Sequence, residues 1–323
     1  MRIVIALAFC SLALPGISQD STSTGGVTTT SLPNETHYPT WIFQAPRVIN
    51  ANSVQLIPKG NLEFGITHTF GDAAGDFGGL KNFFGIDDAQ DIRIGFQYGL
   101  SKHLNIAAAR YKGATKVQRM YEIGLKWLIA EQRDNDPSHP LALAFYANAV
   151  VATMHSGTNP DFENFVHGFS DRLSNDYQLM LARRFGKNFS FQLSPTLIHR
   201  NFTLPYDEKS LFALGGATRI HLHGRFSLLL DYFHTFRSQS TIDSFKVRAT
   251  KFYDALGAGL EIVTEGHVFH LNFTNTKDIL ENRFIPSTTS SWGKGQFRWS
   301  FTIARNFDLL YKKRNKQKKN NSE

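Results

Sequence analysis

Apolar residues recur at every second position through most of the chain beyond residue 60. In NLEFGITHTF, residues 61–70, Leu62, Phe64 and Ile66 share one face, and Glu63 lies on the other. A period of two is that of a β-strand, whose successive side chains point to opposite faces. Helical spacing is rare in the same region. The pattern therefore predicts an all-β fold.

The alternating runs number about twelve, and most are nine to fourteen residues long. Strands of soluble domains usually have about five or six residues, whereas a tilted strand needs about nine to eleven to cross a bilayer. Strand limits read from a sequence shift by about two to four residues, so ten to fourteen strands fit the same pattern. The runs lie near residues 61–70, 90–98, 103–111, 117–130, 140–153, 172–185, 188–200, 211–222, 225–237, 252–263, 267–275 and 295–307.

The links between these runs alternate in length. Short turns follow four of the even-numbered runs, at residues 100–102, 186–187, 223–224 and 264–266. Most of the other links are long, near residues 71–89, 154–171, 201–210, 238–251 and 276–294. Bacterial outer-membrane barrels have short periplasmic turns, long outer loops and an even strand count. We therefore predict a closed antiparallel transmembrane β-barrel of about twelve strands, with both chain ends on the periplasmic side.

The last run, FRWSFTIARNF at residues 297–307, carries Phe297, Trp299, Phe301 and Ile303 on one face. Backbone groups left unpaired in lipid find no water, so a sheet that spans a bilayer must close. We expect this strand to pair with the first one and to turn its aromatic face to lipid. Such an aromatic terminal strand is also the feature that the barrel-insertion machinery reads.

The first residues, MRIVIALAFCSLALPG, combine one early Arg with a short apolar core and a Pro-Gly break. This pattern predicts a signal peptide over residues 1–18, because the apolar run is too short to remain as a membrane helix. Export to the outer membrane follows. The predicted organisation is completed by a flexible polar periplasmic lead at 19–41, the barrel at 42–307 and a basic periplasmic tail at 308–323.

Three stretches carry a resemblance to a known family: HTFGD at 68–72, FGIDDAQDIRIG at 84–95 and YGLSKHLNI at 98–106. Over roughly residues 42–307 the chain resembles an uncharacterised β-barrel family of Bacteroidota-type outer membranes, a domain of unknown function. The resemblance implies an outer-membrane barrel. It supplies no activity and no functional residues.

Charged residues of both signs fall on the face expected to line the lumen. They are Glu63, Arg93, Glu122, Lys126, Asp176, Arg219, Asp231, Glu261 and Arg298. One interpretation is the selectivity lining of a conducting channel. The other is an interior held shut by ion pairs and water, since any such barrel has a polar interior.

Three histidines, His68, His199 and His234, fall on the face expected to meet lipid. A lipid hydrolase would need a Ser beside such a His and a third group to orient the ring. No G-x-S-x-G motif occurs, and no Ser stands at a matching position within a few residues. An interfacial girdle of amphipathic rings is the favoured interpretation, so no catalytic residue is predicted and the protein is not expected to be an enzyme.

Other motifs predict no further chemistry. The HLH pair at 221–223 lacks a third ligand at suitable spacing, so we expect no metal site and no cofactor. The tail YKKRNKQKK suits anionic lipid headgroups, and we expect no nucleic acid in the periplasm. The first long loop, with FGGLKNFFGIDD, is expected to form a short helix that folds into the lumen, covers the mouth or packs as a plain loop.

These features favour a passive outer-membrane channel or uptake protein for small polar solutes. The alternatives are a closed structural or partner-binding barrel without transport, and an outer-membrane lipid hydrolase. The expected partners are outer-membrane lipids and the insertion machinery. The sequence leaves open the oligomeric state and whether the lumen is free.

Overall fold

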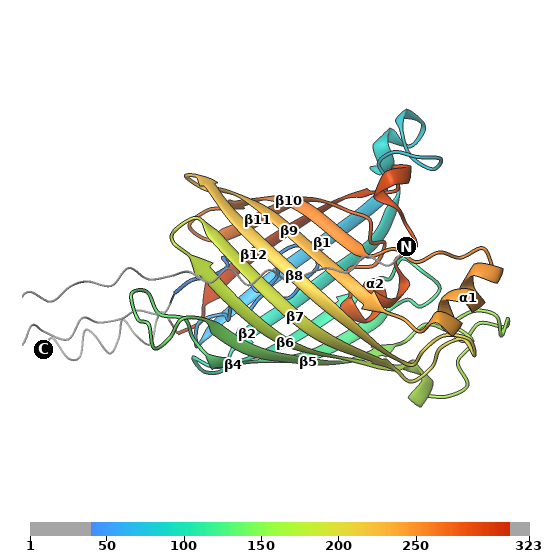
Figure 1. Cartoon of the computed structure of the whole chain (residues 1–323), viewed down its shortest axis with the longest axis horizontal. Helices are drawn as coiled ribbons and strands as arrows, with labels where there is room; N and C mark the ends of the chain where they lie inside the picture. Colours follow the sequence, from blue (N-terminus) through green and yellow to red (C-terminus); the bar gives the residue numbers. More distant parts are fainter. Residues whose placement is uncertain (1–39, 311–323) are drawn as a thin grey trace, which may run out of the picture. The chain divides into compact units, whose positions relative to one another are not determined.

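The computed structural model describes residues 40–310 and shows twelve antiparallel strands closed into one barrel (Figure 1). Each strand pairs with its chain neighbours, and β1 pairs with β12. The predicted fold and its closure by the last strand are therefore confirmed. The signal peptide, nearly all of the polar lead and most of the basic tail lie outside the described residues. The strands are β1 Asn61–Asp72, β2 Ala89–Gly99, β3 Leu104–Tyr111, β4 Met120–Ala130, β5 Ala142–Ala152, β6 Leu173–Phe185, β7 Phe189–Arg200, β8 Ser210–His223, β9 Phe226–Phe236, β10 Ala255–Val263, β11 His267–Thr274 and β12 Arg298–Asp308.

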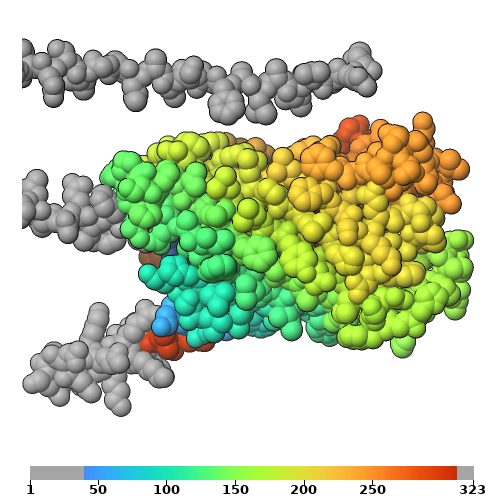
Figure 2. Space-filling view, turned by 60° about the horizontal axis from the view of Figure 1, so that its bottom comes forward, coloured from blue at the N-terminus to red at the C-terminus, as the bar shows by residue number. Residues whose placement is uncertain are grey.

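The wall alternates as the sequence period predicts. In β4, Ile123 is 73% exposed on the outer face, whereas its neighbour Glu122 is 3% exposed on the inner face. The same alternation carries apolar side chains outward around the barrel, as a lipid-facing surface requires. In the space-filling view of Figure 2, the green-to-orange strands form a continuous wall on the visible face.

Short helices occupy the long links, which gather at one end of the barrel (Figure 1). They are η1 Leu80–Gly85, η2 Ser170–Arg172, α1 Gln239–Val247, α2 Glu281–Ser287 and η3 Trp292–Lys294. We call this the outer end, and the opposite end, with its tight hairpins, the short-turn end. Within residues 40–310, no helix is both long and apolar enough to cross a membrane.

The first long loop does not enter the lumen. It forms η1, as expected, but projects sideways from the outer end of the barrel (Figure 1, cyan). Its side chains Phe77, Leu80 and Phe83 are 72%, 82% and 58% exposed. Of the three placements considered for this loop, folding into the lumen is therefore not the one adopted. Two other segments fill the interior.

The first of these segments precedes β1 and consists of residues 41–58, which we call the N-terminal plug. At the short-turn end the Thr40 N–H donates to the Gln132 carbonyl in the β4–β5 link, at 2.9 Å. The plug then rises inside the barrel to a tight turn, where the Val48 N–H donates to the Ala51 carbonyl at 2.9 Å, and returns to β1. Apart from Trp41 at its entrance, its large apolar side chains, such as Ile49, are buried.

The second segment, residues 276–288, descends from the β11–β12 link and contains α2; we call it the outer plug. Its helix packs against β6, β7 and β9, and the rings of Phe284 and Phe233 meet at 5.4 Å in an edge-to-face arrangement. The inner faces of β5–β10 supply many small or apolar side chains to a core shared with both plugs. Gly257 shows the fit, because an added Cβ would collide with the Asp231 carboxylate.

Candidate functional site: the plugged lumen

Polar side chains of the wall bind the backbone of the N-terminal plug. The Lys126 ammonium of β4 donates to the carbonyl oxygens of Pro46 at 3.0 Å and Ser53 at 2.8 Å. The Gln192 side chain of β7 accepts from the Val54 N–H at 2.7 Å. An irregular segment inside a barrel has few backbone partners of its own, so its buried N–H and C=O groups need such side chains.

The tip of the N-terminal plug is fixed by Asp231 of β9. This buried carboxylate accepts from the N–H groups of Asn50 and Ala51, at 2.7 and 3.0 Å. The Asn50 amide donates to the hydroxyls of Thr274 and Thr276, both at 3.1 Å. Hydrogen bonds to a charged acceptor are stronger than neutral ones, so Asp231 is the main polar anchor of the tip.

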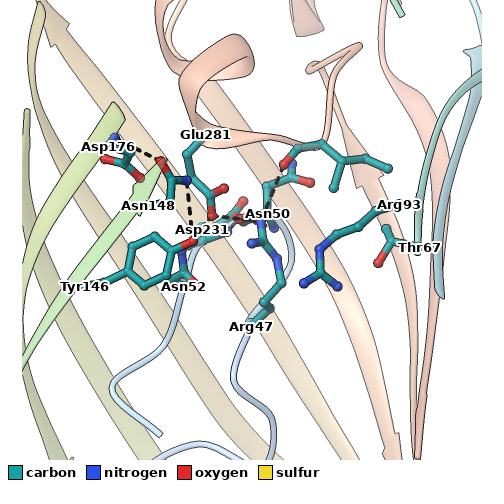
Figure 3. Close-up of polar contacts among 12 residues, drawn as sticks. Arg47, Asn50, Asn52, Thr67, Arg93, Tyr146, Asn148, Asp176, Asp231 and Glu281 are labelled. Carbon is teal, nitrogen blue, oxygen red and sulfur yellow. Dashed lines mark hydrogen bonds and ion pairs between the residues drawn. The ribbon is translucent and has the colours of Figure 1, made fainter. Parts of the chain in front are cut away.

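A buried ion pair joins the two plugs. The guanidinium of Arg47 lies 2.8 Å from the carboxylate of Glu281, with side-chain exposures of 12% and 0%. The Asn52 amide donates to the same carboxylate at 2.9 Å. Figure 3 shows Arg47 rising from the N-terminal plug towards Glu281 on α2. Removing one partner of a buried ion pair is costly because it strands the other charge.

A second buried cluster lies on the wall beside this ion pair. Glu122 accepts from the hydroxyls of Tyr111, at 2.7 Å, and Tyr146, and from the Asn148 amide at 2.9 Å. The Arg93 Nε donates to the Tyr111 hydroxyl at 3.0 Å. Charged groups of this part of the wall therefore satisfy one another and are not free to meet a solute in this state.

The outer loops clamp the outer plug through two carboxylates. Glu163 accepts from Arg283 of α2 at 2.6 Å and from Arg200 at 3.3 Å. Asp207 pairs with Arg200 at 2.9 Å and with Arg237 at 2.8 Å, and Arg237 also donates to a backbone carbonyl of α2. Burial raises the pKa of Glu163, but the two guanidinium groups outweigh it and hold that pKa below its usual value.

Little free space remains where the plugs meet the wall. A cavity of about 20 Å³ is lined by Arg47, Glu63, Arg93 and Lys126, among others. Such a volume holds about one water molecule. A larger cavity of about 340 Å³ lies at the short-turn end, beside Trp41. The lumen is therefore closed at its centre and hollowed towards the short-turn end.

All nine predicted lining residues lie on the inner parity of their strands, and eight are buried, with Glu63 half-buried. Lys126 and Asp231 contact the N-terminal plug, and Arg93 and Glu122 meet through Tyr111, as described above. Their role in conducting ions stays a prediction.

Glu63 lines the small central cavity. Asp176 adjoins the Glu122 cluster, because its N–H donates to the Asn148 side chain at 2.9 Å, and its carboxylate accepts from the Gln178 amide at 2.6 Å.

The other three predicted lining residues lie apart from this centre. Arg219 pairs with Glu261 at 2.6 Å on the wall. Arg298 pairs with Asp72 and donates to nearby loop oxygens at the outer end. The nine residues therefore form separate groups and not one continuous ring.

Sequence reasoning missed the plug residues Arg47, Asn50, Asn52 and Glu281. The N-terminal plug was assigned to the barrel domain as a whole, and Glu281 to an outer link. One signal was available: the stretch WIFQAPRVINANSVQLIP is rich in apolar residues yet lacks the strand period. Such a segment fits neither a lipid-facing strand nor a solvated loop, which leaves the barrel interior.

The three lipid-facing histidines have different neighbours. His68 stacks on an aromatic ring of β12, and His234 bonds Asp254 at 2.9 Å. The His199 Nδ1 lies 2.8 Å from the Ser210 hydroxyl, although no Ser stands within a few residues of these histidines in the sequence. The two residues are eleven positions apart, and the antiparallel pairing of β7 with β8 places them opposite each other. In the described part of the chain, no other side chain bonds the His199 ring to orient it.

Metal ligands do not gather in the part of the chain that the structure describes: no three His, Cys, Asp or Glu side chains between residues 40 and 310 could hold an ion together.

Comparisons with known proteins point to a membrane barrel. The family described as Membrane bound beta barrel domain (DUF5777) matches residues 43–307. No curated protein matches the chain in sequence. Among solved structures, the NanC porin is similar with a TM-score of 0.44 and 8% identity, covering 76% of this chain and 98% of that one. The KdgM porin gives 0.42 and 7%, covering 76% and 99%. An outer-membrane channel from Pseudomonas putida gives 0.42 and 10%, covering 79% and 98%.

Proposed function

Because the chain belongs to this family of membrane-bound β-barrel proteins, we propose that it is an outer-membrane channel for small polar solutes, closed in this state by the N-terminal plug. The plug itself carries the proposal. It precedes the first strand, and the hydrogen-bonded ladder of the barrel closes without it. Movement of residues 41–58 is therefore possible with every strand still paired. The Bacteroidota-type origin of the family stays a prediction.

The polar contacts between the plug and the wall can be replaced by hydrogen bonds to water. Lys126 and Asp231 bind backbone groups of the plug, and a hydrogen bond to a charged group contributes about 1.5–3 kcal/mol relative to the bond with water that replaces it. After release, these two side chains, of opposite sign, would face an aqueous lumen. A wall of both signs suits small polar solutes better than ions of one sign.

The apolar half of the contacts keeps the plug seated. Ile42, Phe43 and Ile49 are each 2% exposed, and fully burying one such side chain contributes about 1.5–3 kcal/mol. Spontaneous release is therefore rare. A twelve-stranded barrel lies between filled barrels of about eight strands and open porins of about sixteen, so the plug decides whether a path exists.

Planar-bilayer recordings of the wild type and of a variant that lacks residues 42–57 test this function. We expect steady conductance from the deletion variant and at most brief openings from the wild type. A matched control removes residues 76–84 of the first long loop, which stays outside the lumen, and should conduct no more than the wild type. If the plug-deleted barrel is folded, as judged by heat-dependent gel mobility, but silent, the channel proposal fails.

A second candidate function is a closed barrel that binds a partner. The observation in its favour is the first long loop, where Phe77 and Leu80 stand exposed and Phe83 and Phe84 adopt positive φ angles of 42° and 54°. Exposed apolar side chains and strained backbone both concentrate at interaction sites. If this alternative is correct, neither the wild type nor the plug-deleted variant conducts. A partner that the wild type captures should not be captured by a Phe77→Ser, Leu80→Ser variant.

A further inference from the structure

A cavity of about 430 Å³ lies at the outer end, between α1 and the segment that leads into β10. Figure 1 shows α1, in orange, beyond the ends of the strands. The volume falls within the range of about 300–1,000 Å³ that is typical of small-molecule sites. Its lining includes Arg237, Ile242, Lys246, Lys251, Phe252 and Asp254.

The floor of this cavity is apolar. Phe252 is packed between the ring of Phe245, at 4.6 Å, and the guanidinium of Arg237, at 4.0 Å from the ring centre. Arg237 is committed to Asp207 and to a carbonyl of α2, so its charge is already compensated. Ile242 adds an aliphatic wall from α1 and is 42% exposed.

The rim of the cavity carries two cations without counter-ions. Lys246 and Lys251 are exposed, and neither ammonium forms an ion pair or hydrogen bond with any residue between 40 and 310. The Lys251 ammonium lies 5.0 Å from the ring centre of Tyr253. An anion placed at the rim would therefore meet two unpaired positive charges.

The carboxylates nearby do not neutralise these cations. Asp254 lines the cavity but is bonded to His234, at 2.9 Å, and to the Tyr232 hydroxyl. Asp243 of α1 accepts from the Gln239 amide at 3.0 Å. With Arg237 paired and Asp254 engaged elsewhere, the balance of the cavity is positive.

We propose that this cavity binds an amphiphilic anion, with an apolar body against Phe252 and Ile242 and a carboxylate or phosphate head between Lys246 and Lys251. The ligand can come from two sources with this chemistry, a free fatty acid or the phosphorylated headgroup of a membrane lipid. The site does not depend on whether the lumen conducts.

Binding of parinaric acid, a fluorescent fatty acid, to the protein in phosphatidylcholine nanodiscs tests the proposal, with its methyl ester as the uncharged probe. We expect saturable binding of the acid and clearly weaker binding of the ester. A Lys246→Gln, Lys251→Gln double variant should bind the acid about fivefold to tenfold more weakly, the effect of two partly exposed ion pairs. Lys209→Gln, which changes an exposed lysine at the same end that does not line the cavity, is the matched control and should bind like the wild type.

Ile242→Trp, which fills the cavity from an exposed position, should abolish binding of both probes. Equal affinity for acid and ester, or no effect of the double variant, would overturn the anion site. Unchanged binding in Ile242→Trp, or no binding to the wild type, would overturn the cavity itself.

Analysis of lipid that copurifies with the protein from its own membrane identifies the source. Bound phosphorus together with acyl chains, reduced in the double variant, indicates a membrane lipid, whereas acyl carboxylate without phosphorus indicates a free fatty acid. Either result supports the site. A wild-type protein that carries neither kind of ligand and binds no parinaric acid overturns it, whatever the plug-deleted barrel conducts.

Discussion

The two plugs close the same lumen by different means. The N-terminal plug enters from the short-turn end, and wall side chains hold its backbone, while its apolar side chains fill the space beside β5–β10. The outer plug is continuous with β11 and β12 at its two ends, and the outer loops clamp it through Glu163 and Asp207. Under the proposed function, the N-terminal plug is the segment that is released and the outer plug the segment that stays.

Their meeting point is the Arg47–Glu281 ion pair. It lies away from water, so its two charges depend on each other. Separation of the plugs would strand Glu281 inside the barrel unless water follows the departing segment. The contact therefore ties release of the N-terminal plug to hydration of the lumen.

The largest effect is expected from Arg47→Met. This change leaves the buried Glu281 carboxylate unpaired, at a cost of about 3–5 kcal/mol to the seated plug. The fraction of time that the channel is open should rise at least a hundredfold in bilayer recordings. Adding Glu281→Gln should restore much of the closure, because no lone charge then remains.

Arg133→Met is the control for this prediction, because it removes a partner from a more exposed pair with Glu131. Its open fraction should match that of the wild type. An Arg47→Met barrel that stays as closed as the wild type would show that the ion pair does not seat the plug.

A smaller effect, on the outer plug, is expected from Glu163→Gln. Its pKa is lowered in the folded protein, so its stabilising effect is present above the unfolded-state pKa of about 4.3 and is lost as pH falls through the folded value. Glu163→Gln should lower the free energy of unfolding at pH 7 by about 1–3 kcal/mol, and the melting temperature should fall with it. The difference between variant and wild type should disappear in acid below the folded-state pKa; a difference that persists there would contradict the assignment.

Substitutions that remove a charge from the wall uncovered by plug deletion are expected to have a moderate effect on ion preference. In the variant that lacks residues 42–57, Arg93→Ala and Glu122→Ala should shift the preference between cations and anions in opposite directions, because each removes one sign from the lining. Reversal potentials in a salt gradient measure this shift. Unchanged potentials in both variants would leave a pore whose lining is formed by other residues.

No effect is expected from substitution of the lipid-facing Ser210, which is part of neither plug. Although its hydroxyl meets His199 at 2.8 Å, a nucleophilic serine also needs a base that a third group orients. Ser210→Ala should leave conductance and stability unchanged, and the wild type should release no fatty acid from phospholipid vesicles. Hydrolysis by the wild type that Ser210→Ala abolishes would instead support the lipid-hydrolase alternative.

The structure of the barrel wall follows from the sequence alone. A period of two over runs of about nine to fourteen residues leaves one polar and one apolar face per strand, and in lipid only a closed sheet satisfies its backbone. The inward parity of Glu122, Lys126 and Asp231 followed from the same alternation, because parity is a local property of the strand.

The segments that fill the lumen are not evident from local sequence and emerge from the tertiary fold. The contacts of Arg47 with Glu281 and of Asp231 with the tip at Asn50 join residues that no local pattern relates. Both contacts span more than a hundred residues of sequence. They arise because closure of the barrel creates an interior that apolar and small side chains must pack, and the segments that enter it are selected by that packing and not by strand periodicity.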